Sequence, residues 1–275
     1  MINVRFPKTN LHTHSSFCDG RQTPEQIVQA AIRQGLTGIG FSSHSPIPYE
    51  NDFAMTEASI YAYREEIKRL KRAYAGQINV FLGIEQDYLS GRPYGRYDYV
   101  IGSVHTMMLD GRPYELDNTK EELLRTVNEQ FRGDIYLLLQ HYFKMVGELV
   151  DVTDCNIIGH FDLVTKNNEK GHFIDTASKA YLDCGLEAIH ALKGKIPFFE
   201  VNTGAIARGY RTSPYPQMEF LKEFKRCGFG VVITSDCHNK TFLDCIYKEA
   251  AELVAQAGFR SKWILTGDGF REVAL

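Results

Sequence analysis

Two histidines stand two positions apart near the start of the sequence, in the segment NLHTHSSFCDG of residues 10–20. If this segment is an extended strand, His12 and His14 point to the same side, because side chains alternate faces with a period of two. Asp19 adds a carboxylate five residues after His14. Two imidazoles and a carboxylate directed at one spot are typical of a metal site. A lone His-x-His pair more often has an ordinary surface or core role, so the rest of the chain must decide.

Six further apolar runs of the sequence end in an imidazole, a carboxylate or both. These runs are GIGFSSH, VFLGIEQDY, YVIGSVH, NIIGHFD, FFEVN and VVITSDCH, and the polar residues at their ends are His44, Glu85, Asp87, His105, His160, Asp162, Glu200, Asn202, Asp236 and His238. With the first run included, such ends hold six of the nine histidines, whereas His141, His172 and His190 lie elsewhere. This distribution indicates one site assembled from separated segments, with His141 and His190 on helices away from it.

The elements that must position these residues alternate along the chain. Short apolar or β-branched runs predict strands, and longer helix-like segments separate them. The predicted strands cover residues 10–14, 38–42, 79–86, 97–104, 156–161, 198–203 and 230–235, with an eighth candidate at 263–266. Strands that alternate with helices in this way are typical of a parallel sheet.

Helix boundaries are also marked in the sequence. The segment TPEQIVQAAIRQG predicts a helix with Thr23 as N-cap in a capping box and Gly35 after its end. The segment TKEELL repeats the box at Thr119 and predicts a long, partly apolar helix that runs toward Val150. A third helix, with one apolar face and a charged, solvated face, is expected between residues 57 and 74.

The fold class that these elements favour is an α/β barrel. No linker, low-complexity tract or internal repeat divides the sequence, so we expect one domain over residues 1–275. An open, doubly wound sheet usually carries a glycine-rich phosphate loop after its first strand. Neither G-x-G-x-x-G nor G-x-x-x-x-G-K-S/T occurs in this sequence. Barrel enzymes build their active sites at the carboxyl ends of the strands, where the histidines and carboxylates fall.

Composition narrows the classes of partner. With 44% hydrophobic and 24% charged residues, the chain has the composition of an ordinary globular protein. A net charge of −3 gives no broad electrostatic reason to bind nucleic acid or an anionic membrane. The start MINVRFPKTN has no apolar signal segment, and no run of about 18 apolar residues occurs. We therefore expect a cytoplasmic protein with no nucleic-acid or membrane partner; the oligomeric state stays open.

The set of candidate ligands points to divalent cations. Imidazole and carboxylate groups without thiolates suit zinc, manganese or iron, and more than four such ligands imply more than one ion. The six cysteines follow no ligand or disulfide spacing and are expected as free thiols. Two neighbouring ions can hold both the attacking and the leaving oxygen of an in-line displacement at phosphorus. The chemistry that fits is hydrolysis of a phosphate ester.

The motifs together resemble a known family. NLHTHSSFCDG, GFSSHSP, GIEQDY, YDYVIGSVH, IIGHFDL, EVNTGAIARG and TSDCHN follow one another in this order over residues 10–239. This succession resembles the polymerase and histidinol phosphatase (PHP) family, and within it the histidinol-phosphatase branch. The resemblance implies a distorted (β/α)7 barrel, similar to a TIM barrel, with a trinuclear metal site at the C-terminal mouth of the strands.

The resemblance also implies three sets of ligands. One ion would take His12, His14, Glu85 and Asp236, a second would share Glu85 and add His105 and His160, and a third would take His44, His238 and Asp19. Many relatives have a histidine where this chain has Asp19, and an aspartate commonly precedes the histidine that stands in GFSSH. Because both departures fall at the third set, we expect two or three divalent ions.

For the reaction itself, we expect a hydroxide that bridges two ions to attack phosphorus in line. Arg208 is the first candidate for holding the phosphate, because a guanidinium can donate two parallel hydrogen bonds to its oxygens. Lys166 is a second candidate, and Ser103 either donates its hydroxyl to the phosphate or caps a turn. The proton for the leaving group is expected from a metal-bound water, from Asp19 or from His238.

Three carboxylates, those of Asp87, Asp162 and Glu200, are expected behind the ligands. A histidine that binds a metal normally gives its other N–H to a carboxylate or a carbonyl. Glu200 and Asn202 alternatively contact the substrate. Loops carry specificity more often than strands do, so the segments 46–53, 88–96 and 164–173 are expected to recognise the leaving group. Tyr49, Phe53 and Tyr94 are the candidate ring contacts in them.

The function expected from all of this is hydrolysis of a small phosphate monoester. The resemblance implies L-histidinol phosphate, which gives L-histidinol and phosphate in histidine biosynthesis. A phosphodiesterase or exonuclease of the same family is the alternative, although the acidic balance of the chain argues against it. A zinc amidohydrolase also opens with His-x-His, but typically has a bridging lysine on its fourth strand that YVIGSVH lacks. A non-catalytic descendant would have gaps among the ligands, and the first two sets have none.

Overall fold

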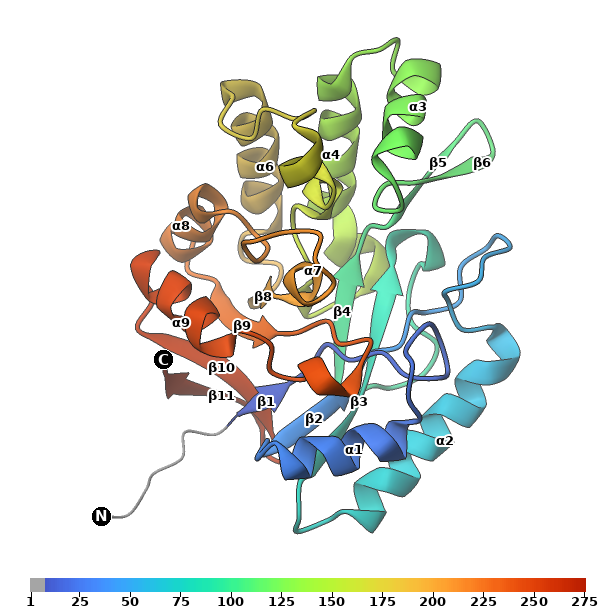
Figure 1. Ribbon diagram of the computed structural model, residues 1–275, viewed down its shortest axis with the longest axis vertical. Helices are drawn as coiled ribbons and strands as arrows, with labels where there is room; N and C mark the ends of the chain where they lie inside the picture. The colour runs from blue at the N-terminus through green and yellow to red at the C-terminus, as the bar shows by residue number, and fades with distance from the viewer. Residues whose placement is uncertain (1–7) are drawn as a thin grey trace.

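The computed structural model describes residues 8–275, and a sheet of seven parallel strands lies at its centre (Figure 1). In spatial order the strands are β1 (Thr9–Asn10), β2 (Gly38–Phe41), β3 (Asn79–Asp87), β4 (Tyr99–Ser103), β7 (Ile157–Ile158), β8 (Phe198–Asn202) and β9 (Gly230–Thr234). Each neighbouring pair in this order is parallel. Each strand overlaps one of the seven segments predicted from the sequence, so the predicted succession is confirmed.

The edge strands β1 and β9 meet just beyond their ends and close the sheet into a barrel. Thr13 and Cys237 form a parallel bridge there. The Cys237 amide donates to the His12 carbonyl at 3.1 Å, and the His14 amide donates to the Cys237 carbonyl at 2.9 Å. The fold is therefore a distorted (β/α)7 barrel, as the resemblance to the PHP family implies.

Two strands, β1 and β7, are shorter than the sequence indicates. β1 ends early because the side chain of Asn10 replaces part of the ladder: its Oδ1 accepts from the amides of His12 at 3.2 Å and of Ser235 at 3.1 Å. β7 has two residues, and beyond it a Cβ on Gly159 would lie 2.5 Å from the Ser103 Oγ. At both places the regular strand ends two residues before a histidine, His12 after β1 and His160 after β7.

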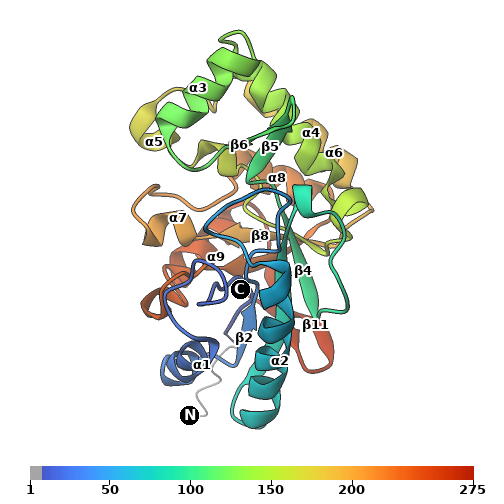
Figure 2. The same cartoon turned by 90° about the vertical axis from the view of Figure 1, so that its right-hand side faces the viewer.

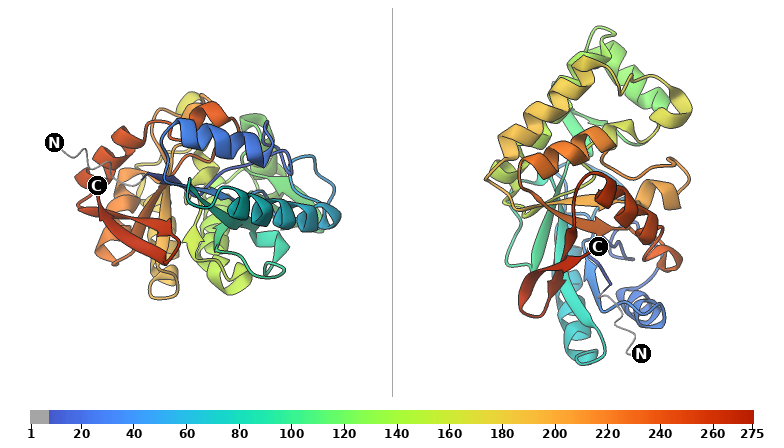
Figure 3. Two further views of the ribbon diagram at one scale, coloured as in Figure 1. Left: turned by 90° about the horizontal axis from the view of Figure 1, so that it is seen from below. Right: turned by 90° about the vertical axis from the view of Figure 1, so that its left-hand side faces the viewer.

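The eighth candidate strand forms, but outside the barrel sheet. β10 (Ser261–Thr266) pairs antiparallel with β11 (Gly269–Ala274) in a hairpin next to the C-terminus (Figure 3). Trp263 of β10 and Phe270 of β11 pack on Phe198, the first residue of β8, with ring centroids 5.1 and 4.4 Å away. The hairpin thus covers the amino ends of the strands and leaves the carboxyl ends open.

Helices connect the strands and cover the barrel. They are α1 (Pro24–Arg33), α2 (Glu57–Ala73), α3 (Lys120–Gln130), α4 (Ile135–Thr153), α5 (Asn168–Gly171), α6 (Lys179–Leu192), α7 (Gly204–Ala207), α8 (Met218–Arg226) and α9 (Tyr247–Gln256), with 3-10 turns η1 (Tyr88–Ser90), η2 (Leu163–Thr165) and η3 (Lys240–Phe242). α1 begins at the predicted capping box of Thr23, and Gly35 follows its end with a φ of 73°. Within residues 8–275, no helix combines the length and the apolar composition that crossing a membrane requires.

The single long helix predicted for residues 119–150 is wrong, because two helices occupy this segment. Arg132 and Gly133 follow α3 with φ angles of 56° and 78°. Two consecutive residues in the left-handed region cannot continue a right-handed helix, and glycine adopts that region at little cost. Asp134 then caps α4 by accepting a hydrogen bond from the Tyr136 amide at 2.9 Å.

Residues 106–153 form a projection that we call the arm. It contains the antiparallel hairpin of β5 (Thr106–Leu109) and β6 (Arg112–Glu115), followed by α3 and α4. The hairpin and α3 lie at the end of the molecule opposite α1 and the C-terminal half of α2 (Figures 1 and 2). Because the arm follows β4 directly, it begins at the open mouth of the barrel.

The barrel interior is apolar at its closed end and polar at its mouth. The ring of Tyr99 fills the closed end, where a Cβ on Gly40 or Gly83 would lie 2.3 or 2.2 Å from a Tyr99 side-chain atom. The Tyr99 hydroxyl donates to the carbonyl of Leu11. Inward positions alternate along a strand, so the face of β3 that makes room for Tyr99 at Gly83 presents Glu85 two residues later.

Replacement of Gly83 by alanine is expected to destabilise the barrel without altering a predicted ligand. The added methyl carbon has no room beside Tyr99, and overpacking of a core costs ~1–3 kcal/mol. The free energy of unfolding, measured by urea denaturation, should fall by that amount. Gly267→Ala is the control, because nothing lies within 4 Å of a Cβ at that position. Equal stability of the two variants would contradict the packing of Tyr99 described above.

Candidate metal centre

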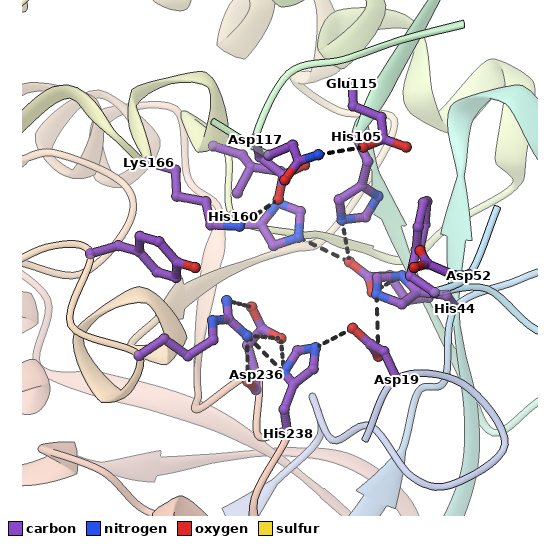
Figure 4. Close-up of a pocket in the computed structure, with 16 residues that line it drawn as sticks. Asp19, His44, Asp52, His105, Glu115, Asp117, His160, Lys166, Asp236 and His238 are labelled. Atoms are coloured by element: carbon purple, nitrogen blue, oxygen red, sulfur yellow. Dashed lines mark hydrogen bonds and ion pairs between the residues drawn. The ribbon is translucent and has the colours of Figure 1, made fainter. Parts of the chain in front are cut away.

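The structure brings all nine predicted metal ligands together at the open mouth of the barrel, where Figure 4 labels Asp19, His44, His105, His160, Asp236 and His238. They are His12, His14, Asp19, His44, Glu85, His105, His160, Asp236 and His238. They form four overlapping groups, and within each group one nitrogen or oxygen atom per residue lies within 4.8 Å of the others. The convergence is a property of the structure, whereas the role of each residue as a ligand stays a prediction.

The loop after β1 supplies three of these side chains. His12 and His14 are fully buried and point to the same place, although the regular strand ends before them. The loop then folds back on itself at Gly20, where a Cβ would lie 2.4 Å from the His14 carbonyl carbon. Only glycine fits such a close approach. The return brings the Asp19 Oδ1 to 3.4 Å from the His14 Nδ1.

Asp236 reaches the site through a distorted strand end. Its φ of 45° lies in the left-handed region, which costs a non-glycine residue roughly 1–2 kcal/mol. The bridge between Thr13 and Cys237 holds the chain on the next residue. Gly204 leaves the space that the turned backbone needs, because a Cβ there would lie 2.7 Å from the Asp236 Cβ. The carboxylate consequently faces the histidines of the first loop.

Glu85 lies in the middle of the cluster with 1% of its surface exposed. Its Oε2 faces three imidazoles: His44 Nδ1 at 2.9 Å, His12 Nε2 at 3.3 Å and His14 Nε2 at 3.5 Å. Burial alone would raise the pKa of Glu85, but the positive charges of the surrounding histidines, His44 foremost, lower it well below its usual range. Glu85 is therefore a buried carboxylate that requires cations around it.

The other oxygen of Glu85 faces a second pair of histidines. Its Oε1 lies 2.9 Å from His160 Nε2 and 3.3 Å from His105 Nε2. The hydroxyl of Ser103 donates to the same oxygen at 2.7 Å. The two oxygens of one carboxylate thus belong to two different groups of donors, as the shared ligand of the first two predicted sets must.

The first predicted set has the spacing that a tetrahedral ion requires. The Asp236 Oδ1 lies 3.1 Å from His14 Nε2 and 3.7 Å from His12 Nε2, and Glu85 Oε2 lies 3.3 and 3.5 Å from the same two nitrogens. Two donors bound ~2.0–2.1 Å from one tetrahedral ion lie about 3.4 Å apart. His12 Nε2, His14 Nε2 and Glu85 Oε2 are also buried without a hydrogen-bond partner. These residues fit a divalent cation.

The third predicted set is more open to solvent. The Asp19 Oδ2 lies 3.0 Å from His238 Nε2, and its Oδ1 lies 3.8 Å from His44 Nε2. His14 joins this group through its Nδ1. The side chains of Asp19 and His238 are 31% and 20% exposed, whereas those of Glu85 and His12 are 1% or less exposed. Weaker burial predicts weaker retention of an ion at this set.

Two of the three carboxylates expected behind the ligands contact histidines as predicted. Glu200 accepts from His12 Nδ1 at 3.0 Å, and the Asp87 Oδ2 lies 3.1 Å from His105 Nδ1. Such contacts fix which ring nitrogen is free to bind a metal. Glu200 is 0% exposed and also accepts from Asn202 at 2.8 Å, so neither residue is available to a substrate in the cavity.

The prediction for Asp162 is wrong, because its carboxylate contacts none of the histidines. Its Oδ2 accepts from the Gln217 amide at 3.2 Å and from the Tyr181 hydroxyl at 3.4 Å. The side chain therefore joins the segment after β7 to the start of α8. The strand β7 ends at Ile158, so Asp162 lies outside the regular sheet.

Positive charge is required at the centre of the cluster. Burial disfavours the charged imidazole of His12, yet the carboxylates of Glu200, Glu85 and Asp236 raise its pKa to about 10. His238 differs: burial, together with the charge of His14, lowers its pKa to about 4. Carboxylates that hold a proton on a neighbouring imidazole offer the same negative potential to a metal cation, which competes with that proton.

The cluster opens into a cavity of about 390 Å³ that we call the central cavity (Figure 4). Arg208 and Lys166, two predicted phosphate contacts, lie in its wall. Arg208 Nη2 pairs with Asp236 Oδ2 at 3.0 Å, and its Nη1 lies 2.7 Å from His238 Nδ1. The third predicted contact, Ser103, is 1% exposed and lies behind Glu85. Its hydroxyl thus orients Glu85 and is not directed at the cavity.

The opposite wall of the central cavity is acidic, which sequence reasoning missed. Asp52, Glu115 and Asp117 line it. Burial and the nearby charges of Asp117, Glu122 and Asp52 raise the pKa of Glu115. Asp117 differs because the Lys166 ammonium, 2.9 Å away, lowers its pKa to about 2 against the effect of burial. Glu115 and Asp117 come from the arm, and no motif in the sequence indicated that the arm returns to the mouth.

The expected ring contacts divide between cavity and surface. Phe53 lines the central cavity, and its ring centroid lies 5.2 Å from that of His44. Tyr49 donates or accepts a hydrogen bond with Thr106 at 2.7 Å and lines a neighbouring groove. The prediction for Tyr94 is wrong: it is 67% exposed and packs on Tyr61. Segment 88–96 therefore does not contact the central cavity.

Comparison with known families identifies the class of this chain. The model of the PHP domain matches residues 10–204, more than half of the chain. The protein belongs to the PHP domain family. The match begins at the strand before His12 and ends at Gly204, so it covers the segments that supply most of the nine converging side chains.

Sequence and structural similarity to relatives covers most of the length of this PHP domain protein. A Bacillus subtilis histidinol-phosphatase is 27% identical and aligns with 84% of this chain and 93% of its own. A crystal structure of histidinol phosphate phosphatase from Lactococcus lactis, complexed with zinc, L-histidinol and phosphate, is 25% identical, covers 96% of this chain and 98% of its own, and has a TM-score of 0.69. A crystal structure from Listeria monocytogenes is 19% identical to this chain. The alignment covers 88% of this chain and 99% of the other, and the TM-score of 0.76 supports the same fold.

Removal of one donor from the first set is expected to lower the metal content of the protein. His12→Ala and Asp236→Asn should each lose about one bound ion per chain, because three donors remain where four hold the cation. Inductively coupled plasma mass spectrometry after metal loading and dialysis measures this, and circular dichroism checks the fold. His141→Ala, on the exposed face of α4, is the control. Equal metal content in all three variants would remove the first set from the centre.

Proposed function

We propose that this PHP domain protein hydrolyses a small phosphate monoester, L-histidinol phosphate, to L-histidinol and phosphate. The observation that carries the proposal is the convergence of nine imidazole and carboxylate side chains, seven of which line one cavity of about 390 Å³. The relatives named histidinol-phosphatase, and the Lactococcus lactis structure with zinc, L-histidinol and phosphate, support this substrate. The same proposal assigns the protein to histidine biosynthesis.

The nine side chains would hold two or three divalent ions, for which zinc, manganese and iron are the candidates. His12, His14, Glu85 and Asp236 would hold one ion, and Glu85, with His105 and His160, a second. His44, Asp19 and His238 would hold the third. Bound there, such ions activate water as a nucleophile and neutralise the charge of the phosphate oxygens.

Arg208 would bind the phosphate group. Its guanidinium borders the central cavity and already pairs with Asp236 Oδ2 at 3.0 Å. The Asp236 charge raises the pKa of Arg208 above its usual range although burial works against it, so the group stays charged at every relevant pH. Lys166 would add a second cation from the facing loop, where it pairs with Asp117.

The pair of Asp19 and His238 is the candidate for handling the proton of the leaving oxygen. The two side chains lie 3.0 Å apart in the wall of the central cavity. Burial alone would raise the pKa of Asp19. The imidazoles of His44, His14 and His238 nevertheless hold this pKa below its usual range. Asp19 therefore orients His238, and in protein whose third set holds no ion, a proton shared between them would be delivered through the histidine.

The acidic wall favours a leaving group that carries positive charge. L-Histidinol has an ammonium group and an imidazole, and Asp52 and Glu115 offer carboxylates on the side of the central cavity that faces away from Asp236, the partner of Arg208 (Figure 4). The same wall argues against a polyanionic substrate. A diesterase that acts on nucleic acid needs a basic groove with stacking rings, whereas the groove next to this wall is lined by Glu50, Glu122 and Glu129 against two arginines.

A substrate panel tests the reaction class. Protein loaded with manganese or zinc should release phosphate from L-histidinol phosphate and more slowly from p-nitrophenyl phosphate, and should leave bis-p-nitrophenyl phosphate and an oligonucleotide intact. Phosphate release and nitrophenol absorbance measure these rates. His12→Ala and Asp236→Asn should abolish turnover, since each removes a donor of the first set. Cleavage of the diester and the oligonucleotide alone would refute the proposed activity.

Neutralisation of the acidic wall tests the choice of substrate. Glu115→Gln and Asp52→Asn should each raise the KM for L-histidinol phosphate about fivefold, because a partly exposed ion pair contributes up to ~1 kcal/mol. The KM for p-nitrophenyl phosphate, whose leaving group has no positive charge, should stay constant. Glu65→Gln, on the exposed face of α2, is the matched control. A parallel change for both substrates would show that the wall does not read the leaving group.

A further inference from the structure

A second hollow adjoins the central cavity on the side of Arg208. It has a volume of about 380 Å³, and we call it the Arg21 hollow. Its walls include Arg21, Asn239 and Phe242, together with Arg208 and Tyr210. Because Arg208 and Tyr210 also line the central cavity, the two spaces share a wall and lie on either side of one guanidinium.

The Arg21 hollow is lined by hydrogen-bond donors that lack acceptors. The Arg21 amide donates to the His238 carbonyl at 3.0 Å, which holds this residue beside the site. The Arg21 guanidinium has no ion-pair or hydrogen-bond partner among residues 8–275. Asn239 accepts at Oδ1 from the amide and hydroxyl of Thr241 at 3.2 and 3.1 Å, which leaves its Nδ2 hydrogens without an acceptor in the described chain.

The charges around the hollow suit an anion. Two guanidiniums, those of Arg21 and Arg208, face one space, and the carboxylate of Asp236 compensates only Arg208, at 3.0 Å. A guanidinium binds phosphate oxygens through parallel N–H donors, and these charge-assisted bonds are about twice as strong as neutral ones. An anion at this place would satisfy donors from three residues at once.

The opposite end of the central cavity repels the same anion. Asp52 and Glu115 line that end, where Lys166 compensates the charge of Asp117. The adjoining groove continues with Glu50 and Glu122. A phosphate ion released beside Arg208 therefore meets negative charge in one direction and Arg21 in the other. In the direction of Arg21 it keeps its contact with Arg208, because this side chain borders both spaces.

We propose that the Arg21 hollow is a second phosphoanion subsite, which takes up inorganic phosphate after it leaves the metal centre. The inference rests on the proposed function in one respect, that inorganic phosphate is a product. Arg21, Arg208 and Asn239 supply the donors of this subsite. The leaving alcohol departs through the acidic groove, so the two products separate toward opposite charges.

Phosphate binding tests the subsite without turnover. Isothermal titration calorimetry of inorganic phosphate into the metal-loaded protein should give an affinity that falls about fivefold in Arg21→Ala, the size expected for one partly exposed charge. Arg21→Lys should retain most of the affinity, since it keeps the charge. Raised ionic strength should shrink the difference, because salt screens exposed charges. Arg33→Ala, an exposed arginine at the end of α1, should bind phosphate as the parent protein does.

Product inhibition separates this proposal from the proposed function. The inhibition constant of phosphate against L-histidinol phosphate hydrolysis should rise about fivefold in Arg21→Ala, while inhibition by L-histidinol stays the same. If the protein hydrolyses no monoester but binds phosphate in an Arg21-dependent way, the subsite stands and the function fails. If hydrolysis proceeds and the phosphate affinities of Arg21→Ala and the parent protein agree, the subsite is refuted and the function stands.

A bisphosphate probe distinguishes the two sources of the anion. Butane-1,4-diol bisphosphate carries a second phosphate on the substrate itself. If the Arg21 hollow binds that second group, Arg21→Ala should raise the KM of the bisphosphate but leave that of butyl phosphate constant. If the hollow serves the product alone, Arg21→Ala should weaken phosphate inhibition with no preference between these two substrates. Both results support a phosphoanion subsite. If neither the KM of the bisphosphate nor the inhibition constant of phosphate changes in Arg21→Ala, the proposal is overturned.

Discussion

The rest of the site depends on one buried carboxylate, that of Glu85, because its charge must be surrounded by cations or hydrogen-bond donors. It lies at the mouth of the barrel with 1% exposure, and its two oxygens face five histidines from four segments of the chain. A buried charge is tolerated only when cations or donors surround it. The carboxylates around His12 and Glu85 beside His105 raise the pKa of these two imidazoles, which favours their charged forms, and divalent cations would supply positive charge in their place. The clustering of imidazoles is thus an electrostatic requirement of Glu85 as well as a feature of the proposed chemistry.

The barrel around Glu85 works because its closed end is filled. Tyr99 occupies the volume left free at Gly40 and Gly83, and the hairpin of β10 and β11 covers the amino ends of the strands. With the interior packed there, inward positions nearer the mouth can be polar. Closure of the ring between β1 and β9 then holds the first loop against the last strand end, which brings His14 to 3.1 Å from Asp236. Packing at one end of the barrel and polar chemistry at the other are therefore linked.

The charges around the site are distributed asymmetrically, which the set of predicted metal ligands does not show. Arg208 and Arg21 lie on one side of the nine converging residues, and Asp52 and Glu115 lie on the other. This asymmetry suits a substrate with a negative group to be removed and a positive group to be recognised. It also explains why the net charge of the chain says little about its partner: carboxylates and guanidiniums are separated within one cavity, and a sum over the whole sequence averages them out.

The sequence by itself determined the order of the strands along the chain and the polar residues at their ends, because these are local patterns. The choice of nine ligands among the polar residues came from the succession of motifs, which resembles the PHP family. Alternation of strands and helices, capping boxes and polar strand ends all act over a few residues. Only the tertiary structure decided that Ser103 lies behind Glu85, that Asp162 turns to Gln217, and that the arm returns Glu115 and Asp117 to the mouth. Those outcomes depend on where separate segments pass one another in space, and on left-handed residues such as Arg132 that redirect the chain. No pattern within one segment encodes the position of another.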